Sequence, residues 1–195
     1  MSSNVLTLRK SLRLKRRKVD CFTQKQSSRK VLQRLNQSAI FKQHQRIGIY
    51  LDAFGEIQTH HIIMWLFKVG KKVYLPKICN MNQHLHWVHI SKQQYLSKRF
   101  NKHRFGMYEP MQSRAHSVQH LDLLLLPLLI CDERGTRIGM GGGFYDRTLS
   151  RAPIRPYRVG LAHEFQCINT PLKREKWDQS LDTLVTPEKI RKFRR

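Results

Sequence analysis

The stretch LDLLLLP, residues 121–127, decides the fold that this sequence predicts. Its apolar side chains do not alternate with polar ones, as they would in a strand with one face in water. A continuous apolar run that ends at a proline is typical of a strand buried on both faces of a parallel sheet. The run is too short to cross a bilayer, which needs about 20 apolar residues. We therefore expect a central strand here, with helices on both faces of its sheet.

The sequence before this run predicts a βαβ unit. RIGIYL (46–51) is a short β-rich run, THHIIMWLFKVG (59–70) is typical of a helix that stops at Gly70, and KKVYLP (71–76) is typical of a strand that ends at Pro76. This order favours parallel strands joined by a crossover helix. Further strands are expected over HLHWVHI (84–90), RPYRVGLA (155–162) and LDTLVT (181–186).

Two helices are expected before the first strand. Residues 5–19 place apolar side chains at roughly helical spacing with Arg and Lys between them, which we interpret as a basic helix of the fold rather than a mitochondrial presequence. A second helix is expected over 28–44, whereas 91–120 is polar and is expected to be mostly loop. Because no internal repeat or low-complexity linker interrupts the sequence, residues 1–195 are expected to form one α/β domain.

The composition is strongly basic. The chain has 37 Lys and Arg against 13 Asp and Glu, a formal net charge of +24. Such an excess attracts polyanions, which include nucleic acid, anionic lipid, nucleotides and polyacidic substrates. The cations are spread from Arg9 to Arg195, so charge alone selects none of these partners. A nucleic-acid-binding protein without catalytic activity is the alternative function, although no RNA-recognition, helix-turn-helix or zinc-finger signature supports it.

The cysteines and histidines give weak signals. The four cysteines lie far apart and form no CxxC pair, which argues against a zinc ribbon or a disulfide framework and suits a reducing cytoplasm. In HLHWVH, His84 and His86 share one face of a strand, but no acid or cysteine is close in sequence, so a metal site there is a weaker hypothesis. His60 and His61 are interpreted as an ordinary helix pair.

The stretch RIGMGGGFYDRTLSR (137–151) carries the chemistry. Four of the chain's 10 glycines lie within residues 139–143, after the apolar run and before a helix expected to begin at Phe144 or Tyr145. Ligands of α/β sheets bind beyond the carboxyl ends of the strands, and glycines let main-chain N–H groups approach a phosphate. Arg137 and Arg147 add positive charge, and Asp146 is suited to hold Mg²⁺.

Known phosphate-binding motifs do not match this stretch. It contains no GxxxxGK[ST] sequence, and it lacks the glycine spacing and the downstream acid of a dinucleotide-binding fingerprint. The residues alone therefore indicate an anion or nucleotide loop beside an acid that can bind metal. The alternative is a tight turn that needs glycine for its geometry alone.

Several motifs together resemble one known family. GMGGGFYDRTL (139–149), VGLAHEFQ (159–166) and LDTLVTP (181–187) resemble those of 5-formyltetrahydrofolate cyclo-ligases, also called methenyltetrahydrofolate synthetases. Further similarity follows in the family's order, in LRKSLRLKRR (8–17), RIGIYLDAFGEIQTHHI (46–62), FGMYEP (105–110) and LDLLLLPLLICDERGTRIGMGGGFYD (121–146). The resemblance implies a Rossmann-like three-layer α/β/α fold with a largely parallel sheet.

The resemblance also implies a reaction. Members of this family use ATP and Mg²⁺ to convert 5-formyltetrahydrofolate into 5,10-methenyltetrahydrofolate, with release of ADP and phosphate. The formyl oxygen is phosphorylated, and N10 of the folate then attacks the formyl carbon. Catalysis of this kind depends on positioning and charge neutralisation, so no Ser, Cys or His nucleophile is expected.

The implied ligand-binding positions fall into three groups. The first, for ATP, joins the first helix to the glycine stretch and contains Arg9, Lys10, Arg13, Arg137, Ile138, Gly139, Met140, Gly141, Gly142, Gly143, Phe144 and Tyr145. The second, for the folate, contains Leu51, Glu56 and Phe105, with Met140–Phe144 bordering the formyl group. The third, for the metal, contains Asp146 and Asp182. Val5 replaces a lysine that many relatives carry, which removes one potential phosphate partner.

The expected setting of the enzyme follows from the same resemblance. We expect a monomeric cytoplasmic enzyme of one-carbon metabolism that has no membrane partner and no specific nucleic-acid partner. Its basic surface is expected to help gather ATP and the polyglutamate tail of the folate.

Overall fold

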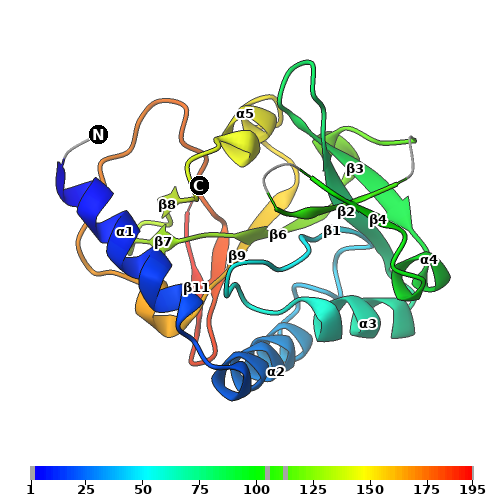
Figure 1. Cartoon of the computed structure of the whole chain (residues 1–195), viewed down its shortest axis with the longest axis horizontal. Helices are drawn as coiled ribbons and strands as arrows, with labels where there is room; N and C mark the ends of the chain where they lie inside the picture. The colour runs from blue at the N-terminus through cyan, green and yellow to red at the C-terminus, as the bar shows by residue number, and fades with distance from the viewer. Residues whose placement is uncertain (1–2, 104–105, 112–113, 195) are drawn as a thin grey trace.

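A twisted sheet runs through the centre of the computed structural model, which describes residues 3–103, 106–111 and 114–194 (Figure 1). Within these residues the sheet has seven strands in the order β11-β10-β9-β6-β1-β2-β3. Their bounds are β1 (Arg46–Gly48), β2 (Lys72–Ile78), β3 (Leu85–Ile90), β6 (Leu123–Pro127), β9 (Tyr157–Leu161), β10 (Thr183–Val185) and β11 (Ile190–Lys192). The five inner strands pair in parallel, whereas the edge strands β3 and β11 pair antiparallel to their neighbours.

Strand β6 is the buried central strand that the apolar run predicted. It pairs with β1 on one side and β9 on the other, and Leu123 to Leu126 have no exposed surface. Leu123 and Leu125 belong to the core on one face of the sheet, and Leu124 and Leu126 belong to the core on the other face. A leucine therefore fits at every position, because both faces of the strand exclude water.

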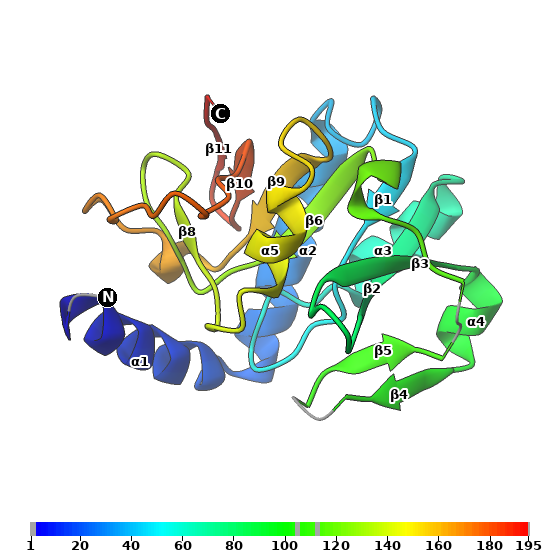
Figure 2. The ribbon, with the colours of Figure 1, turned by 90° about the horizontal axis from the view of Figure 1, so that it is seen from above.

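Helices form a layer on each side of this sheet (Figure 2). α2 (Cys21–Gln37) and α3 (His60–Lys68) pack on one face through buried side chains such as Leu35 and Leu66. α5 (Phe144–Ser150) packs on the opposite face through Leu149. The predicted three-layer α/β/α architecture with a largely parallel sheet is confirmed.

The predicted βαβ unit is also confirmed, with one correction. β1, α3 and β2 follow one another, and β1 and β2 pair in parallel with Ile47 opposite Val73. α3 stops two residues before Gly70, whose φ is +72°. The expected end at Pro76 is wrong, since β2 continues to Ile78. β1 pairs with residues 72–74 of β2, so Pro76 lies beyond that pairing, where a missing N–H is tolerated.

Two other expectations about elements need correction. α2 covers Cys21–Gln37 rather than 28–44, because the Asp20 side chain caps the helix by accepting a hydrogen bond from the Thr23 N–H at 2.9 Å. About half of the described residues in 91–120 lie in regular elements rather than in loop. They form α4 (Lys92–Leu96), β4 (Phe100–Lys102), β5 (Tyr108–Pro110) and the short 3-10 helix η1 (Val118–His120). A two-stranded hairpin of β7 (Ile130–Cys131) and β8 (Arg137–Ile138), unpredicted, connects β6 to the glycine stretch.

The first helix, α1 (Ser3–Arg17), packs against this hairpin. Leu12 of α1 is buried beside Leu129 and Ile130, with Leu8 at the margin of the same cluster. α1 therefore belongs to the folded unit, as expected. Along the described stretches of the chain, every helix is too short or too polar to pass through a bilayer.

Candidate active site

The candidate site lies where three neighbouring parallel strands end. Residues 49–57 follow β1, residues 128–129 follow β6, and His163 follows β9. Hydrogen bonds hold these segments together: the His163 ring Nε2 lies 3.0 Å from the Gly55 carbonyl oxygen, and Arg16 of α1 donates to the Leu128 carbonyl oxygen at 3.0 Å. This is the edge at which ligands of α/β proteins bind.

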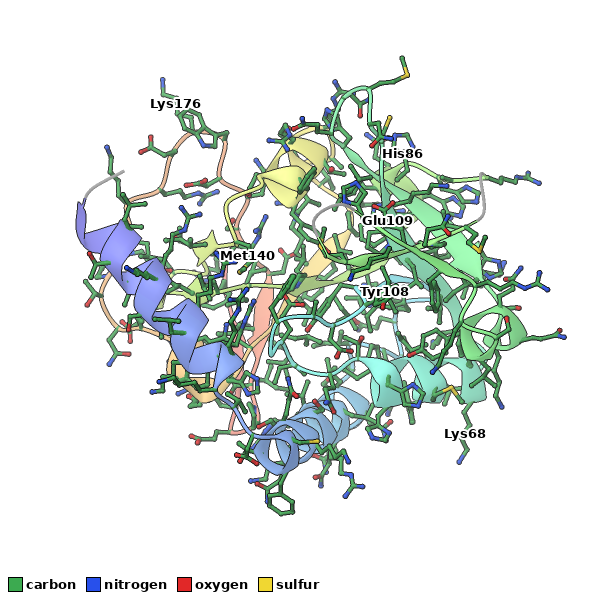
Figure 3. The ribbon with its side chains drawn as sticks, viewed as in Figure 1. Lys68, His86, Tyr108, Glu109, Met140 and Lys176 are labelled. Carbon is green, nitrogen blue, oxygen red and sulfur yellow. The ribbon has the colours of Figure 1, made fainter. Side chains whose placement is uncertain are left out.

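The basic face of α1 meets the glycine segment, which we define as residues 139–143. Arg9 donates to the Gly139 carbonyl oxygen at 3.2 Å. A cavity of about 220 Å³ lies between the two elements, lined by Arg9, Lys10, Arg13, Leu129 and Met140. Figure 3 shows Met140 beside α1. The structure thus brings the three α1 cations of the predicted ATP group next to Met140, which is far from them in sequence.

The backbone of the glycine segment explains most of its glycines. Gly141 has φ +110° and Gly143 has φ +64°, conformations that L-residues rarely adopt. At Gly142 the limit is space, because a Cβ there would lie 2.7 Å from the Phe144 ring. Geometry alone therefore requires glycine at these positions. It also leaves an exposed main chain without a side chain at Gly141, where a Cβ would lie 3.8 Å from the Arg9 guanidinium, and such a surface fits phosphate groups.

The rest of the predicted ATP group surrounds this segment. Arg137 and Ile138 lie on β8, and Phe144 and Tyr145 begin α5. The Arg137 guanidinium is nearly buried and lies 5.8 Å from the centre of the Tyr145 ring. The tyrosine's pKa is raised, first by burial and then by the negative charge of Glu56, so Tyr145 remains a neutral phenol.

The two predicted metal ligands are linked through other side chains. Asp146 accepts hydrogen bonds from Arg137 at 2.7 Å and from the Gln179 N–H at 3.2 Å. The Arg158 guanidinium donates to the Gln179 side-chain oxygen at 3.1 Å, and the main-chain N–H of Arg158 donates to the Asp182 carboxylate at 2.7 Å. A chain of hydrogen bonds thus connects Asp146 with Asp182. Among the described residues, no three His, Cys, Asp or Glu side chains form a metal-binding group.

Of the predicted folate group, Glu56 lies across Arg16 from the glycine segment. Glu56 has only 11% of its side chain exposed, and one carboxylate oxygen accepts the Ala53 N–H at 3.1 Å. Burial raises its pKa to about 7 despite the opposing effect of Arg16. Leu51 is partly buried against the core on the α2–α3 face of the sheet. Phe105, the third member, lies outside the described residues.

Sequence reasoning missed Arg16 and His163. Arg16 has no exposed surface and joins α1 to the other segments of the site. Its position was a usable signal, because it follows Leu8 and Leu12 at four-residue spacing and therefore faces inward. His163 is buried, which lowers its pKa, and its ring is stacked on Phe165. No sequence signal indicated that it would contact the turn after β1.

A second cavity, of about 330 Å³, lies away from this site. It is lined by Ile90, Gln94, Arg99, Phe100, Pro110 and Met111, between α4 and the β4–β5 hairpin. None of these residues belongs to the groups predicted to bind ATP, folate or metal. Size alone would favour this cavity, but the smaller cavity is lined by three cations and borders the glycine segment, which suits an anionic ligand.

Comparison with known proteins identifies relatives over most of the chain. The model of the 5-formyltetrahydrofolate cyclo-ligase family matches residues 2–187. The Haemophilus influenzae protein named 5-formyltetrahydrofolate cyclo-ligase is 33% identical over 183 residues, which cover 91% of this chain and 95% of the relative. The Escherichia coli K12 protein of the same name is 35% identical over 148 residues, 74% of this chain and 79% of the relative.

Solved structures agree with these relatives. The structure of Aquifex aeolicus 5,10-methenyltetrahydrofolate synthetase superposes with a TM-score of 0.82 at 27% identity, covering 97% of this chain and 92% of that one. A 5,10-methenyltetrahydrofolate synthetase from Mycoplasma pneumoniae has the same fold, with a TM-score of 0.74 at 19% identity over 96% of this chain and all of that one.

Proposed function

Because this chain belongs to the 5-formyltetrahydrofolate cyclo-ligase family, we propose that it uses ATP and Mg²⁺ to convert 5-formyltetrahydrofolate into 5,10-methenyltetrahydrofolate, ADP and phosphate. It is an enzyme of the ligase class. When bound, ATP supplies a phosphoryl group to the formyl oxygen, which can then leave as phosphate once N10 has attacked the formyl carbon. The observation that carries the proposal is the glycine segment beside the cations of α1, with Met140 in the wall of the cavity they line and Gly141 next to Arg9.

On the nucleotide side, the chain supplies hydrogen-bond donors and positive charge. The main chain of Gly141–Gly143 contacts the phosphates, and Arg9, Lys10 and Arg13 neutralise their charge from the opposite wall. Val5, which stands in place of the family's lysine, contributes no positive charge. The α1 cations therefore carry this role without a fourth partner at position 5.

On the folate side, Glu56 accepts hydrogen bonds from the amino and ring N–H groups of the pterin. A carboxylate suits a pair of such donors, and the burial of Glu56 strengthens the interaction. Leu51 and Phe105 contact the folate, and Met140–Phe144 border its formyl group. The contacts of Arg16 with both Glu56 and Met140 support a formyl group that lies beside the nucleotide phosphates.

The metal would be held by Asp146, with Asp182 as a second acid. Carboxylate oxygens are the ligands that Mg²⁺ prefers, and Asp146 lies on the first turn of α5 directly after the glycine segment. Arg137 lies 2.7 Å from Asp146, so it holds the carboxylate in place and offsets its negative charge. The fit is better for Asp146, whose side chain is 24% exposed beside the glycine segment, than for Asp182, which is 9% exposed at the amino end of β10.

The setting of the enzyme is part of the same proposal. We place a monomer in the cytoplasm, where the free thiols of all four cysteines are stable. The basic surface gathers ATP and the polyglutamate tail of the folate. Nucleic acid is attracted only as a nonspecific polyanion, and the chain has no membrane partner.

A spectrophotometric assay tests the function. Purified protein with 5-formyltetrahydrofolate and Mg²⁺ should generate the absorbance of the methenyl product when ATP is added, and none without ATP. Arg46 and Asp122 pair at the other end of the sheet, so Asp122→Asn serves as a control that keeps this activity. If the protein makes no product and binds RNA with an affinity that resists salt, the nucleic-acid-binding alternative is favoured instead.

A further inference from the structure

The guanidinium of Arg16 contacts three segments that are distant in sequence. Its Nε donates to the Phe54 carbonyl oxygen at 3.1 Å, in the turn after β1. Nη1 donates to the Leu128 carbonyl oxygen at 3.0 Å, just after β6, and Nη2 lies 3.3 Å from the Met140 sulfur in the glycine segment. Nη1 is also 3.5 Å from a Glu56 carboxylate oxygen. Every nitrogen of this buried cation therefore faces a different part of the candidate site.

We propose that Arg16 is the positioning residue that ties the folate-binding carboxylate, Glu56, to the nucleotide-binding glycine segment. This inference rests on the proposed function and extends it. Arg16 does not touch the reacting atoms. It fixes the distance between the two ligand-binding parts, and its positive charge favours the carboxylate form of Glu56, which accepts the pterin N–H groups.

The backbone shows that the turn is fitted closely to the end of α1. Gly55 has φ +79°, and a Cβ at this position would lie 2.2 Å from the Arg16 carbonyl oxygen. Only glycine therefore allows the turn to pack here, and the packing brings Arg16 within reach of both Phe54 and Glu56. The His163 ring also contacts the Gly55 carbonyl oxygen, so the turn is held both by α1 and by the segment that follows β9.

The contact between Arg16 and Glu56 is long and leaves capacity for a ligand. At 3.5 Å it is an ion pair rather than a short bidentate bond, and among the described residues Glu56 accepts one further hydrogen bond, from Ala53. A carboxylate can accept about four hydrogen bonds. The pair thus supplies charge compensation without using up the acceptor sites of Glu56.

The charge state of Glu56 depends on the groups around it. Arg16 on α1 is the cation that favours ionisation, and Asp52 in the same turn opposes it. The phenols of Tyr50 and Tyr145, at the end of β1 and on α5, are neutral because burial raises the pKa of each. Removal of the Arg16 charge would therefore leave Glu56 protonated at neutral pH.

Two substitutions separate the electrostatic and geometric parts of this role. Arg16→Met removes the charge but keeps an unbranched side chain. We expect the acidic limb of the pH profile of kcat/KM for the folate to move from about pH 7 to a pH that is higher by about one unit or more. Arg16→Lys keeps the charge but not the contacts to three segments, so KM for both substrates should rise about 10- to 100-fold with the acidic limb unmoved. Lys18→Met, at an exposed position just after α1, is the control and should change neither.

The titration of Glu56 without substrates separates this inference from the proposed function. Carbon-13 NMR of labelled glutamate, with the Glu56 signal assigned from Glu56→Gln, should show a higher pKa in Arg16→Met than in the unmodified protein. If the unmodified protein makes no methenyl product, the proposed function fails, whatever the NMR shows. If turnover occurs but the Glu56 titration and the acidic limb are the same in Arg16→Met, the positioning role is wrong. Should Arg16→Met fail to fold, Arg16→Lys with an unchanged folate KM would equally overturn it.

Discussion

Two arginine–carboxylate pairs lie at opposite ends of the same sheet and differ in almost every respect. At the amino ends of β1 and β6, Asp122 accepts two hydrogen bonds from the Arg46 guanidinium, at 2.6 and 3.1 Å, and two more from main-chain N–H groups. At the carboxyl ends, Glu56 lies 3.5 Å from Arg16 and accepts one main-chain N–H. The first pair is partly exposed, whereas the second is almost completely buried.

The pKa values of the two carboxyls move in opposite directions. Burial alone would raise the pKa of Asp122, but the hydrogen bonds from Arg46 outweigh it and lower the pKa to about 2. For Glu56 burial dominates over Arg16 and raises the pKa to about 7. A carboxylate whose acceptor sites are filled stabilises the fold. A buried carboxylate with unfilled sites costs stability and is explained better by a ligand.

The largest effect on activity is expected at a third arginine–carboxylate pair, Arg137 and Asp146. Like the Arg16–Glu56 pair, it belongs to the candidate site. Asp146→Ala should reduce kcat by about 1,000-fold, since it removes the proposed metal ligand and leaves Arg137 without its partner. Circular dichroism should show an intact fold. If kcat stays within about threefold of the unmodified enzyme, Asp146 does not hold the metal.

The next effect contrasts the two pairs directly. Glu56→Gln should raise KM for the folate about 100-fold, because a charged acceptor for two pterin donors is lost. Asp122→Asn should leave KM and kcat unchanged, since Asp122 lies at the other end of the sheet. Steady-state kinetics of both variants measure the difference. Equal changes of KM in the two variants would mean that the carboxyl-end pair has no special role in binding the folate.

The pH dependence of stability should have opposite signs for the two carboxyls. The pKa of Glu56 is raised in the folded state, so the folded protein binds a proton that the unfolded chain has released between about pH 4.5 and pH 7. As the pH rises from about 4.5 to about 7, the free energy of unfolding of the unmodified protein should therefore fall relative to that of Glu56→Gln, by up to about 3 kcal/mol. Urea denaturation at several pH values measures the loss. A constant difference between the two proteins would show that Glu56 titrates normally.

Asp122 should show the reverse, with a smaller magnitude. Its pKa is lowered in the folded state, so its contribution is present above its ordinary value of about 3.8 and is lost as the pH falls towards 2. Asp122→Asn should therefore destabilise the protein by about 1–2 kcal/mol at pH 7, after allowance for solvent screening of this partly exposed pair. The same denaturation series serves as the measurement, and a stability equal to that of the unmodified protein at pH 7 would contradict the structural role.

The smallest effect concerns the basic surface, which neither pair explains. If the net charge of +24 gathers the polyglutamate tail, KM for 5-formyltetrahydrofolate should fall a few-fold as glutamates are added, and salt should weaken this dependence. Kinetics with one to five glutamates at two salt concentrations measure it. A KM that does not change with tail length would reject this use of the charge.

The sequence predicted those parts of the fold whose signals are local. The apolar run of 121–127 and the order of elements in the βαβ unit identified the central strand and the parallel pairing, because burial and crossover chirality constrain both. The two-residue strands β7 and β8 were missed, since such strands are too short for a periodic pattern. The early start of α2 depended on one capping residue, Asp20.

The candidate site was predictable in its residues but not in its connections. The glycine stretch, Glu56 and the α1 cations stand out by composition and by resemblance to the family. The contacts between Arg9 and Gly139 and between Arg16 and Glu56 join positions 130 and 40 residues apart, and only the folded chain brings them together. An inward-facing arginine after Leu8 and Leu12 was the one local sign of this junction.

A crystal structure with a non-hydrolysable ATP analogue, Mg²⁺ and 5-formyltetrahydrofolate would locate both ligands. We expect the phosphates on the main chain of Gly141–Gly143, facing Arg9, Lys10 and Arg13, and the pterin hydrogen-bonded to Glu56. Phosphates bound elsewhere, or a pterin that leaves Glu56 paired with Arg16 alone, would contradict this expectation.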